Sequence, residues 1–162
     1  PSMETPRNTE DYEGFYHLID MSGDVSHATL HYIVRDHDPN LFEAKKETLR
    51  LITKNMNEKW GDGCVSLTIT DQYKNMSEII KDCPHLIENT KKACEMAGVT
   101  PLVLPIRGGT DGCQLSFRGL PCPNLGTGGH AYHGPYEHIT VEGMNHCVDI
   151  IVELICLYSK IR

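Results

Sequence analysis

The sequence predicts an α+β half followed by an α/β half. The first half has strands of alternating polar and apolar residues around one long helix. The second half alternates helices with short apolar strands, which is typical of α/β layering. The pattern changes near residues 74–84, where we place the boundary between two domains.

Two strands open the chain after a polar lead-in over residues 1–14. The first is expected over Phe15–Met21 and the second over Ser26–Arg35, with a turn at residues 22–24 between them. The second strand alternates strictly, which predicts one buried face. That face would carry Ala28, Leu30, Tyr32 and Val34.

A helix and a third strand complete the first half. The helix is expected to begin at Asp38-Pro39, because proline suits the first helical position, and to end at Gly61-Asp62-Gly63. Apolar and polar residues then alternate over 65–70, which predicts another half-buried strand. One helix on an antiparallel sheet is the expected α+β layer.

The second half contains three expected helices and two short strands. Gly98 closes the first helix, Thr110 or Asp111 caps the second, and Thr140 caps the third. The helices are expected over 84–98, 111–117 and 140–160, and the strands over 102–104 and 121–125.

Composition and charge narrow the class of protein. The net charge of −7 argues against nucleic acid or an anionic membrane surface as the main partner. No run reaches the roughly 18 apolar residues needed to span a bilayer, and no signal peptide is visible. The seven cysteines are odd in number and form no Cys-x-x-Cys pair. We expect reduced, structural cysteines in a cytoplasmic protein.

Two glycine-rich segments carry the candidate chemistry. Arg107–Gly112 could hold a carboxylate or phosphate with backbone N–H groups and the arginine fork, or could simply be a strand-to-helix turn. It fits neither the Walker nor the dinucleotide pattern. His130, His133, Glu137 and His138 could ligate a metal, or could form a solvated polar loop.

Two further polar residues are candidates outside these segments. Arg35 ends a strand and could clamp a ligand, although a surface ion pair is the more common role. Asn75 could bind a substrate or close a turn.

Six segments together resemble peptidase T, the zinc-dependent tripeptide aminopeptidase whose superfamily includes carboxypeptidase G and aminoacylase. The resemblance covers essentially the whole chain. The segments are Tyr12–Leu18, His31–Asp36, Pro105–Gly112, Gln114–Phe117, Gly119–Leu125 and His133–Glu137.

The resemblance implies a C-terminal portion of that longer enzyme. Residues 1–76 would be the second part of its lid (dimerisation) domain, an α+β sandwich, and residues 77–162 the C-terminal part of its zinc-exopeptidase α/β catalytic domain. The resemblance further implies that His133 is a ligand of one of two zinc ions. The implied substrate-binding residues are Arg35, Asn75, Arg107, Gly108, Gly109 and Thr110.

The resemblance also implies what this chain lacks. The family's other zinc ligands, its glutamate general base and a lid histidine would all lie upstream of Pro1. We therefore expect part of a tripeptide aminopeptidase that is inactive without its N-terminal portion. The alternative is a non-catalytic dimerisation or assembly module. A partial sheet leaves open strand edges, so we also expect a homo-oligomer.

Overall fold

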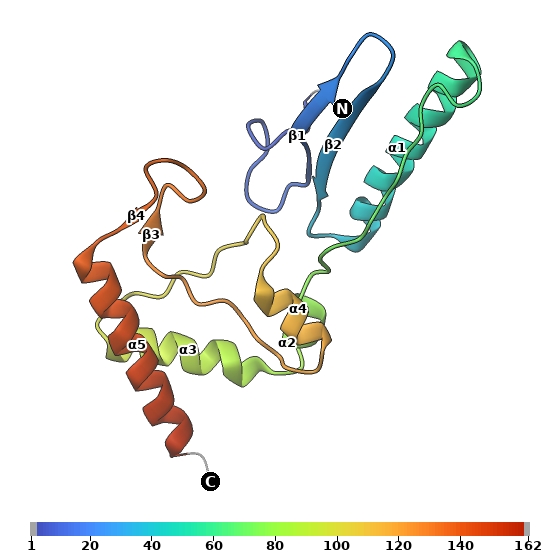
Figure 1. Ribbon diagram of the computed structural model, residues 1–162. Coiled ribbons are helices and arrows are strands. Elements are labelled where there is room, and N and C mark those ends of the chain that lie inside the picture. The colour runs from blue at the N-terminus through green and yellow to red at the C-terminus, as the bar shows by residue number, and fades with distance from the viewer. Residues whose placement is uncertain (1–2, 161–162) are drawn as a thin grey trace. The chain divides into compact units, whose positions relative to one another are not determined.

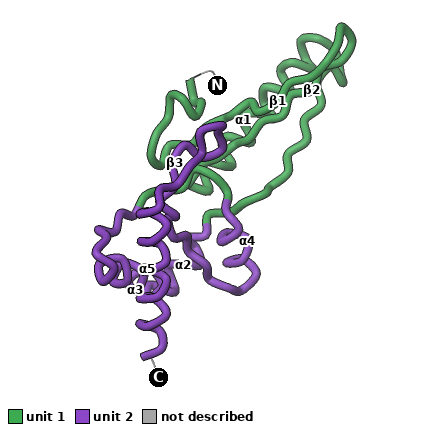
Figure 2. The backbone as a smooth tube through the Cα atoms, turned by 60° about the vertical axis from the view of Figure 1, so that its left-hand side comes forward, with its two compact units in different colours: residues 1–75, 104–109 green, residues 76–103, 110–162 purple. Residues whose placement is uncertain are grey.

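A computed structural model describes residues 3–160. The chain divides into two compact units, which are described separately (Figure 2). The first unit contains residues 1–75 and 104–109, and the second contains residues 76–103 and 110–162. The elements in chain order (Figure 1) are β1 (Phe15–Gly23), β2 (Ala28–Arg35), α1 (Pro39–Trp60), α2 (Ser77–Ile80), α3 (Pro84–Met96), α4 (Asp111–Phe117), β3 (Gly129–His130), β4 (His138–Ile139) and α5 (Val141–Ser159).

In the first unit, β1 and β2 form an antiparallel hairpin that packs beside the long helix α1 (Figure 1). The predicted start of α1 is confirmed: the Asp38 carboxylate accepts hydrogen bonds from the backbone N–H groups of Asn40 and Leu41, at 2.7 and 3.1 Å. Such a cap satisfies donors that have no partner within the helix. Gly61 ends α1 with a φ of 106°, a conformation that favours glycine.

The predicted strand over residues 65–70 is wrong. This segment runs beside α1 without strand pairing (Figure 1), and an asparagine side chain takes the place of a neighbouring strand. The Asn57 amide donates to the Val65 carbonyl oxygen at 2.9 Å and accepts from the Val65 N–H at 2.7 Å. The alternating pattern therefore marks a segment packed on a helix, since an extended chain has the same period with or without a pairing partner.

The predicted buried face of the second strand is also wrong. Leu30 and Tyr32 are each 48% exposed, although the strand itself forms and pairs along its whole length. Only two strands make up this sheet, and on that face Ala28 is also exposed and Val34 is only partly buried. The alternating pattern therefore predicted the strand correctly. It does not indicate whether another element packs on the apolar face of that strand.

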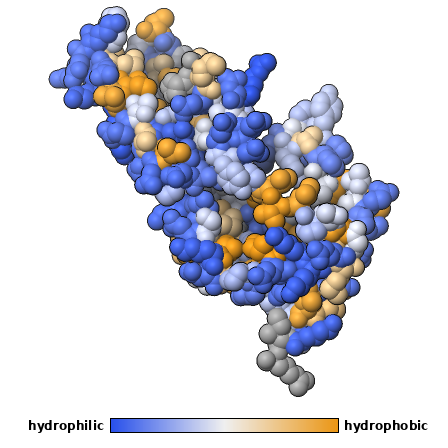
Figure 3. Space-filling model, turned by 180° about the vertical axis from the view of Figure 1, so that it is seen from behind, coloured by the Kyte–Doolittle hydropathy of each residue, from blue (hydrophilic) through white to orange (hydrophobic). Residues whose placement is uncertain are grey.

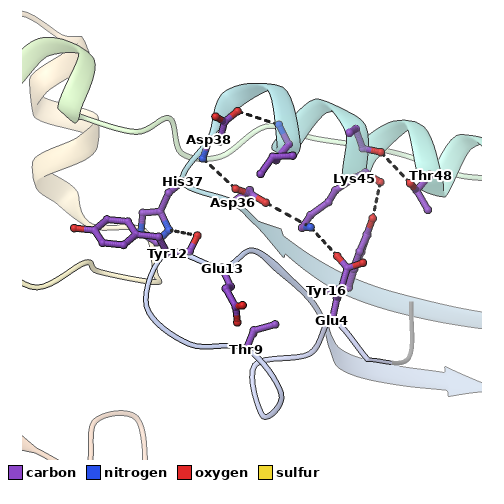
Figure 4. Close-up of polar contacts among 12 residues, drawn as sticks. Glu4, Thr9, Tyr12, Glu13, Tyr16, Asp36, His37, Asp38, Lys45 and Thr48 are labelled. Carbon is purple, nitrogen blue, oxygen red and sulfur yellow. Dashed lines mark hydrogen bonds and ion pairs between the residues drawn. The ribbon is translucent and has the colours of Figure 1, made fainter.

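Lys45 ties the start of the chain to α1 (Figure 4). Its ammonium lies 2.7 Å from a carboxylate oxygen of Glu4 and 3.4 Å from one of Asp36, whose side chain is only 2% exposed. The Tyr16 hydroxyl donates to the Lys45 carbonyl oxygen at 3.1 Å. Gly14 is required here, because a Cβ at that position would lie 2.1 Å from the Asp36 carboxylate.

Lys46, the next residue, is itself buried and ties α1 to the segment after residue 65. Its ammonium lies 2.5 Å from a carboxylate oxygen of Glu43 and 2.9 Å from one of Asp71. It also lies 4.5 Å from the centre of the Phe42 ring. The two carboxylates satisfy a charge that would be costly to bury alone.

These two lysines predict a loss of stability at alkaline pH. Burial alone would lower the pKa of Lys45, but Glu4 and Asp36 outweigh it and raise that pKa. The hydrogen bonds that the Lys46 ammonium donates to Glu43 and Asp71 raise the pKa of Lys46. The stabilisation is therefore complete below the unfolded lysine pKa of about 10.4 and is lost as pH rises through the raised folded values. We expect the urea midpoint of unfolding to fall above that pH.

A double variant, Lys45→Met with Lys46→Met, provides the control. It keeps apolar stems but no ammonium groups, so its urea midpoint should depend less on pH in the alkaline range than that of the wild type. Equal alkaline slopes in the two proteins would contradict the assignment.

In the second unit, α3 packs against α5. The buried centre consists of Ala93, Cys94 and Ile150, with partly buried apolar residues around it. Both predicted helices are confirmed: Gly98 follows α3 with a φ of 74°, and the Thr140 hydroxyl accepts from the Gly143 N–H at 3.0 Å at the start of α5. Helix α4 is confirmed over residues 111–117, with Thr110 as its N-terminal flanking residue.

The predicted strands over residues 102–104 and 121–125 are wrong: in the described residues 3–160, neither segment forms a strand. The segments lack a neighbouring strand among the described residues, and strand formation requires backbone partners from one. Leu102 is 79% and Val103 64% exposed. The short antiparallel pair β3–β4 was not predicted.

Apolar surface is therefore widely exposed. Figure 3 shows apolar side chains in the open on one face of the molecule. In α5, Val148, Ile151, Val152 and Ile155 are between 48% and 63% exposed. Such continuous apolar surface usually marks a site of contact with another polypeptide. Across residues 3–160, no helix combines the length and apolar character needed to cross a membrane.

Candidate functional site

Arg107 anchors residues 104–109 inside the first unit. Its Nη1 donates to the Thr9 carbonyl oxygen at 2.5 Å, and its Nη2 donates to the Thr9 hydroxyl at 2.6 Å and the Glu13 carbonyl oxygen at 3.2 Å. The guanidinium carbon also lies 5.0 Å from the centre of the Phe15 ring. The planar fork thus joins the glycine loop to a segment more than 90 residues earlier in the sequence.

His37 forms a second connection to the same loop. One ring nitrogen, Nδ1, lies 3.3 Å from the Tyr12 carbonyl oxygen, and the other, Nε2, lies 3.2 Å from the Ile106 carbonyl oxygen. Figure 4 shows the His37 ring beside Tyr12, whose ring it meets edge-on with centroids 5.1 Å apart. The Asn75 amide donates to the His37 carbonyl oxygen at 3.0 Å.

Tyr73 lies between two of the predicted substrate-binding residues. The Arg35 guanidinium carbon is 5.2 Å from the centre of its ring, within cation–π range. On the loop side, a Cβ at Gly109 would come within 2.2 Å of the ring, so only glycine permits this approach. A Cβ at Gly108, by contrast, would have no atom within 4 Å, so this glycine is not required by space.

Four of the predicted substrate-binding residues are therefore linked within the first unit: Arg35, Asn75, Arg107 and Gly109. Tyr73 lies between Arg35 and Gly109, and His37 contacts both Asn75 and Ile106, the neighbour of Arg107. Neither Tyr73 nor His37 was predicted as a site residue. Their contacts with residues 106 and 109 join distant parts of the sequence, and no local pattern signals them. Thr110 and His133 belong to the second unit.

His133 lies in the turn between β3 and β4. Its φ of 62° is in the left-handed region, and its backbone N–H donates to the Glu137 carboxylate at 3.0 Å, which fixes the turn. The His133 side chain is exposed. Within residues 3–160, no three His, Cys, Asp or Glu side chains lie close enough to hold a metal ion. A zinc centre needs three or four protein ligands, and the described residues do not bring that many together.

Comparisons with known proteins identify relatives of the chain. No protein-family model matches it. Peptidase T from Desulfitobacterium hafniense strain DCB-2 is 51% identical over 160 residues, which is 99% of this chain and 39% of the relative. Peptidase T from Alkaliphilus oremlandii is 49% identical over the same length, again 39% of the relative. The chain is homologous to the C-terminal portion of peptidase T.

A solved structure has a fold similar to that of this chain. The crystal structure of a tripeptidase from Staphylococcus aureus aligns with a TM-score of 0.63 at 15% identity, over 96% of this chain and 42% of that one. The predicted resemblance to peptidase T is thus confirmed, and the fold matches part of a tripeptidase. The chain spans about two fifths of the length of the peptidase T relatives it matches.

Proposed function

We propose that this chain is part of a zinc-dependent tripeptide aminopeptidase, which releases the N-terminal residue of a tripeptide with metal-activated water. The observation that supports this most directly is the 51% identity with peptidase T over 160 residues. The aligned length of 160 residues includes both the glycine loop and the His133 turn. The fold likeness to a tripeptidase supports the same substrate class.

In this proposal each part of the chain has one role. Residues 1–76 form part of the lid (dimerisation) domain, and residues 77–162 form the C-terminal part of the catalytic domain. His133 ligates one of two zinc ions, which would supply a water nucleophile at neutral pH. Arg35, Asn75, Arg107, Gly108, Gly109 and Thr110 bind the tripeptide.

The chain alone is proposed to be inactive, because residues 3–160 do not complete a zinc centre. It requires the portion that the longer relatives possess in addition. The exposed apolar residues 102–103 and the open apolar side of α5 support a contact with such a portion. The seven free cysteines support a reducing compartment, and we propose the cytoplasm.

Complementation tests this function. The chain is co-expressed with the part of D. hafniense peptidase T that it does not match, and the purified pair is assayed with an unmodified tripeptide and with its N-acetylated form. We expect zinc-dependent hydrolysis of the free tripeptide only, and none from either polypeptide alone. A folded, co-purifying pair without activity would overturn the proposal and would favour a non-catalytic assembly module.

A further inference from the structure

His37 contacts two backbone carbonyl groups, one at each nitrogen of its ring. Its Nδ1 lies 3.3 Å from the Tyr12 carbonyl oxygen, and its Nε2 lies 3.2 Å from the Ile106 carbonyl oxygen. The His37 side chain is half-buried, with its ring beside that of Tyr12 (Figure 4). His37 therefore connects the lead-in before β1 to residues 104–109, which include the start of the glycine loop.

Both contacts can be hydrogen bonds only if the His37 ring is doubly protonated. A carbonyl oxygen accepts and cannot donate, so each ring nitrogen needs a proton of its own. A neutral imidazole has one N–H and one lone pair, and that lone pair would face the second carbonyl oxygen. The imidazolium donates from both nitrogens, and a charged donor forms the stronger hydrogen bond. The geometry around His37 therefore suits the charged form of the ring.

Titratable or charged side chains are found on every segment that contacts His37. They are Asp11, Tyr12, Glu13, Asp36, Asp38, Lys74 and Arg107. Three of them are engaged elsewhere: Asp36 lies 3.4 Å from the Lys45 ammonium, Asp38 caps α1, and Arg107 donates to the lead-in. The groups that face the two ring nitrogens directly are the carbonyl oxygens of residues 12 and 106.

We propose that His37 is a pH-sensitive positioning residue for the glycine loop. The imidazolium holds residues 104–109 against the lead-in, and deprotonation removes one of its two hydrogen bonds. The connection is thus complete at low pH and is lost as pH rises through the range of about 5–8 in which histidines ordinarily titrate. Arg107 stays charged throughout that range, so the segment is loosened and not released.

NMR of the 162-residue chain between about pH 5 and about pH 8 tests this inference. The ring nitrogen signals of His37 report its protonation, and the Ile106 carbonyl signal reports the contact. We expect the two to change with one common midpoint. Amide protection factors of residues 106–109, corrected for the intrinsic effect of pH on exchange, should fall by about three- to tenfold, as expected for one lost hydrogen bond.

Two glutamine variants separate this role of His37 from general effects of pH. His37→Gln is neutral at every pH, so its residues 106–109 should show little pH dependence and the weaker protection of the wild type at high pH. His31→Gln is the matched control, because it removes an exposed imidazole from β2 in the same unit and should keep the wild-type profile. An Ile106 carbonyl signal that does not follow the His37 ring would overturn the proposal, as would a full pH dependence in His37→Gln.

The consequence for tripeptide binding rests on the proposed function, whereas the effect on the loop is measured without substrate. In an active complemented enzyme, the KM for a tripeptide should rise with pH more steeply in the wild type than in His37→Gln, while kcat follows the same profile in both. Identical KM profiles would contradict a positioning role in binding. A common midpoint for His37 and Ile106 together with an inactive complemented pair would support the role of His37 and overturn only the proposed function.

Discussion

Replacing His133 with glutamine should remove one zinc ion from the complemented enzyme and lower kcat/KM for a tripeptide by at least about a hundredfold. In the proposed function His133 is a direct zinc ligand, and removing such a ligand should cost no less than the 10–100-fold typical of outer-shell partners. The His133 side chain is exposed, and its backbone N–H, which donates to Glu137, is kept in the variant, so the substitution retains the hydrogen bond that fixes the turn. Zinc content by elemental analysis and tripeptide hydrolysis are the two measurements.

His146→Gln is the matched control, because it removes an exposed imidazole from α5 in the same unit. This control should keep the zinc content and the activity of the complemented wild type. Full activity in His133→Gln would contradict the ligand role, whereas equal losses in both variants would point to a general effect on the second unit.

The helices were predictable from sequence because their signals are local. Asp38 with Pro39 marked the start of α1, and Thr140 marked the start of α5; both side chains accept the capping hydrogen bonds that the pattern implied. The glycines at 61 and 98 marked helix ends by their positive φ values. None of these signals needs a residue from another part of the chain.

The strands were less predictable because a strand depends on its partner. The hairpin β1–β2 formed, since the turn brings its two strands together. Residues 65–70, 102–104 and 121–125 have the composition of strands, but no described strand lies beside them to complete a ladder. Alternating patterns and apolar runs indicate which side chains of a segment could be buried. They do not indicate whether another strand or helix lies beside the segment to bury them.

In the candidate site, too, the local features were predictable from the sequence and the contacts between distant residues were not. The glycine loop was recognisable from its residues. Glycine is needed at position 109 because the backbone there lies too close to the Tyr73 ring for a Cβ. The partners of Arg107, however, lie at residues 9 and 13, and those of His37 at residues 12 and 106. A single sequence contains no signal for such distant pairings.

Arg107→Ala should destabilise the first unit by about 2–3 kcal/mol. The substitution removes a charged donor from three oxygens and exposes the face of Phe15. A hydrogen bond to a charged group contributes about 1.5–3 kcal/mol net of solvent exchange, and because Arg107 is only partly buried we expect the three contacts together to contribute about as much as one such bond. Arg107→Lys should recover only part of the loss, because one ammonium cannot reproduce the two-nitrogen fork. Urea unfolding followed by circular dichroism measures the effect, and hydrogen exchange of residues 104–109 localises it.

Arg50→Ala is the control, since that half-exposed arginine of α1 pairs with the exposed Glu47 on the same helix and should contribute less than 1 kcal/mol. The comparison also separates two roles for Arg107 in the complemented enzyme. An anchoring role predicts loss of stability and faster exchange at residues 104–109 in the absence of substrate. A role confined to substrate binding predicts a higher KM with unchanged unfolding. The three donor contacts to Thr9 and Glu13 favour the first result, in which Arg107 fixes the conformation of the glycine loop that we propose binds the tripeptide.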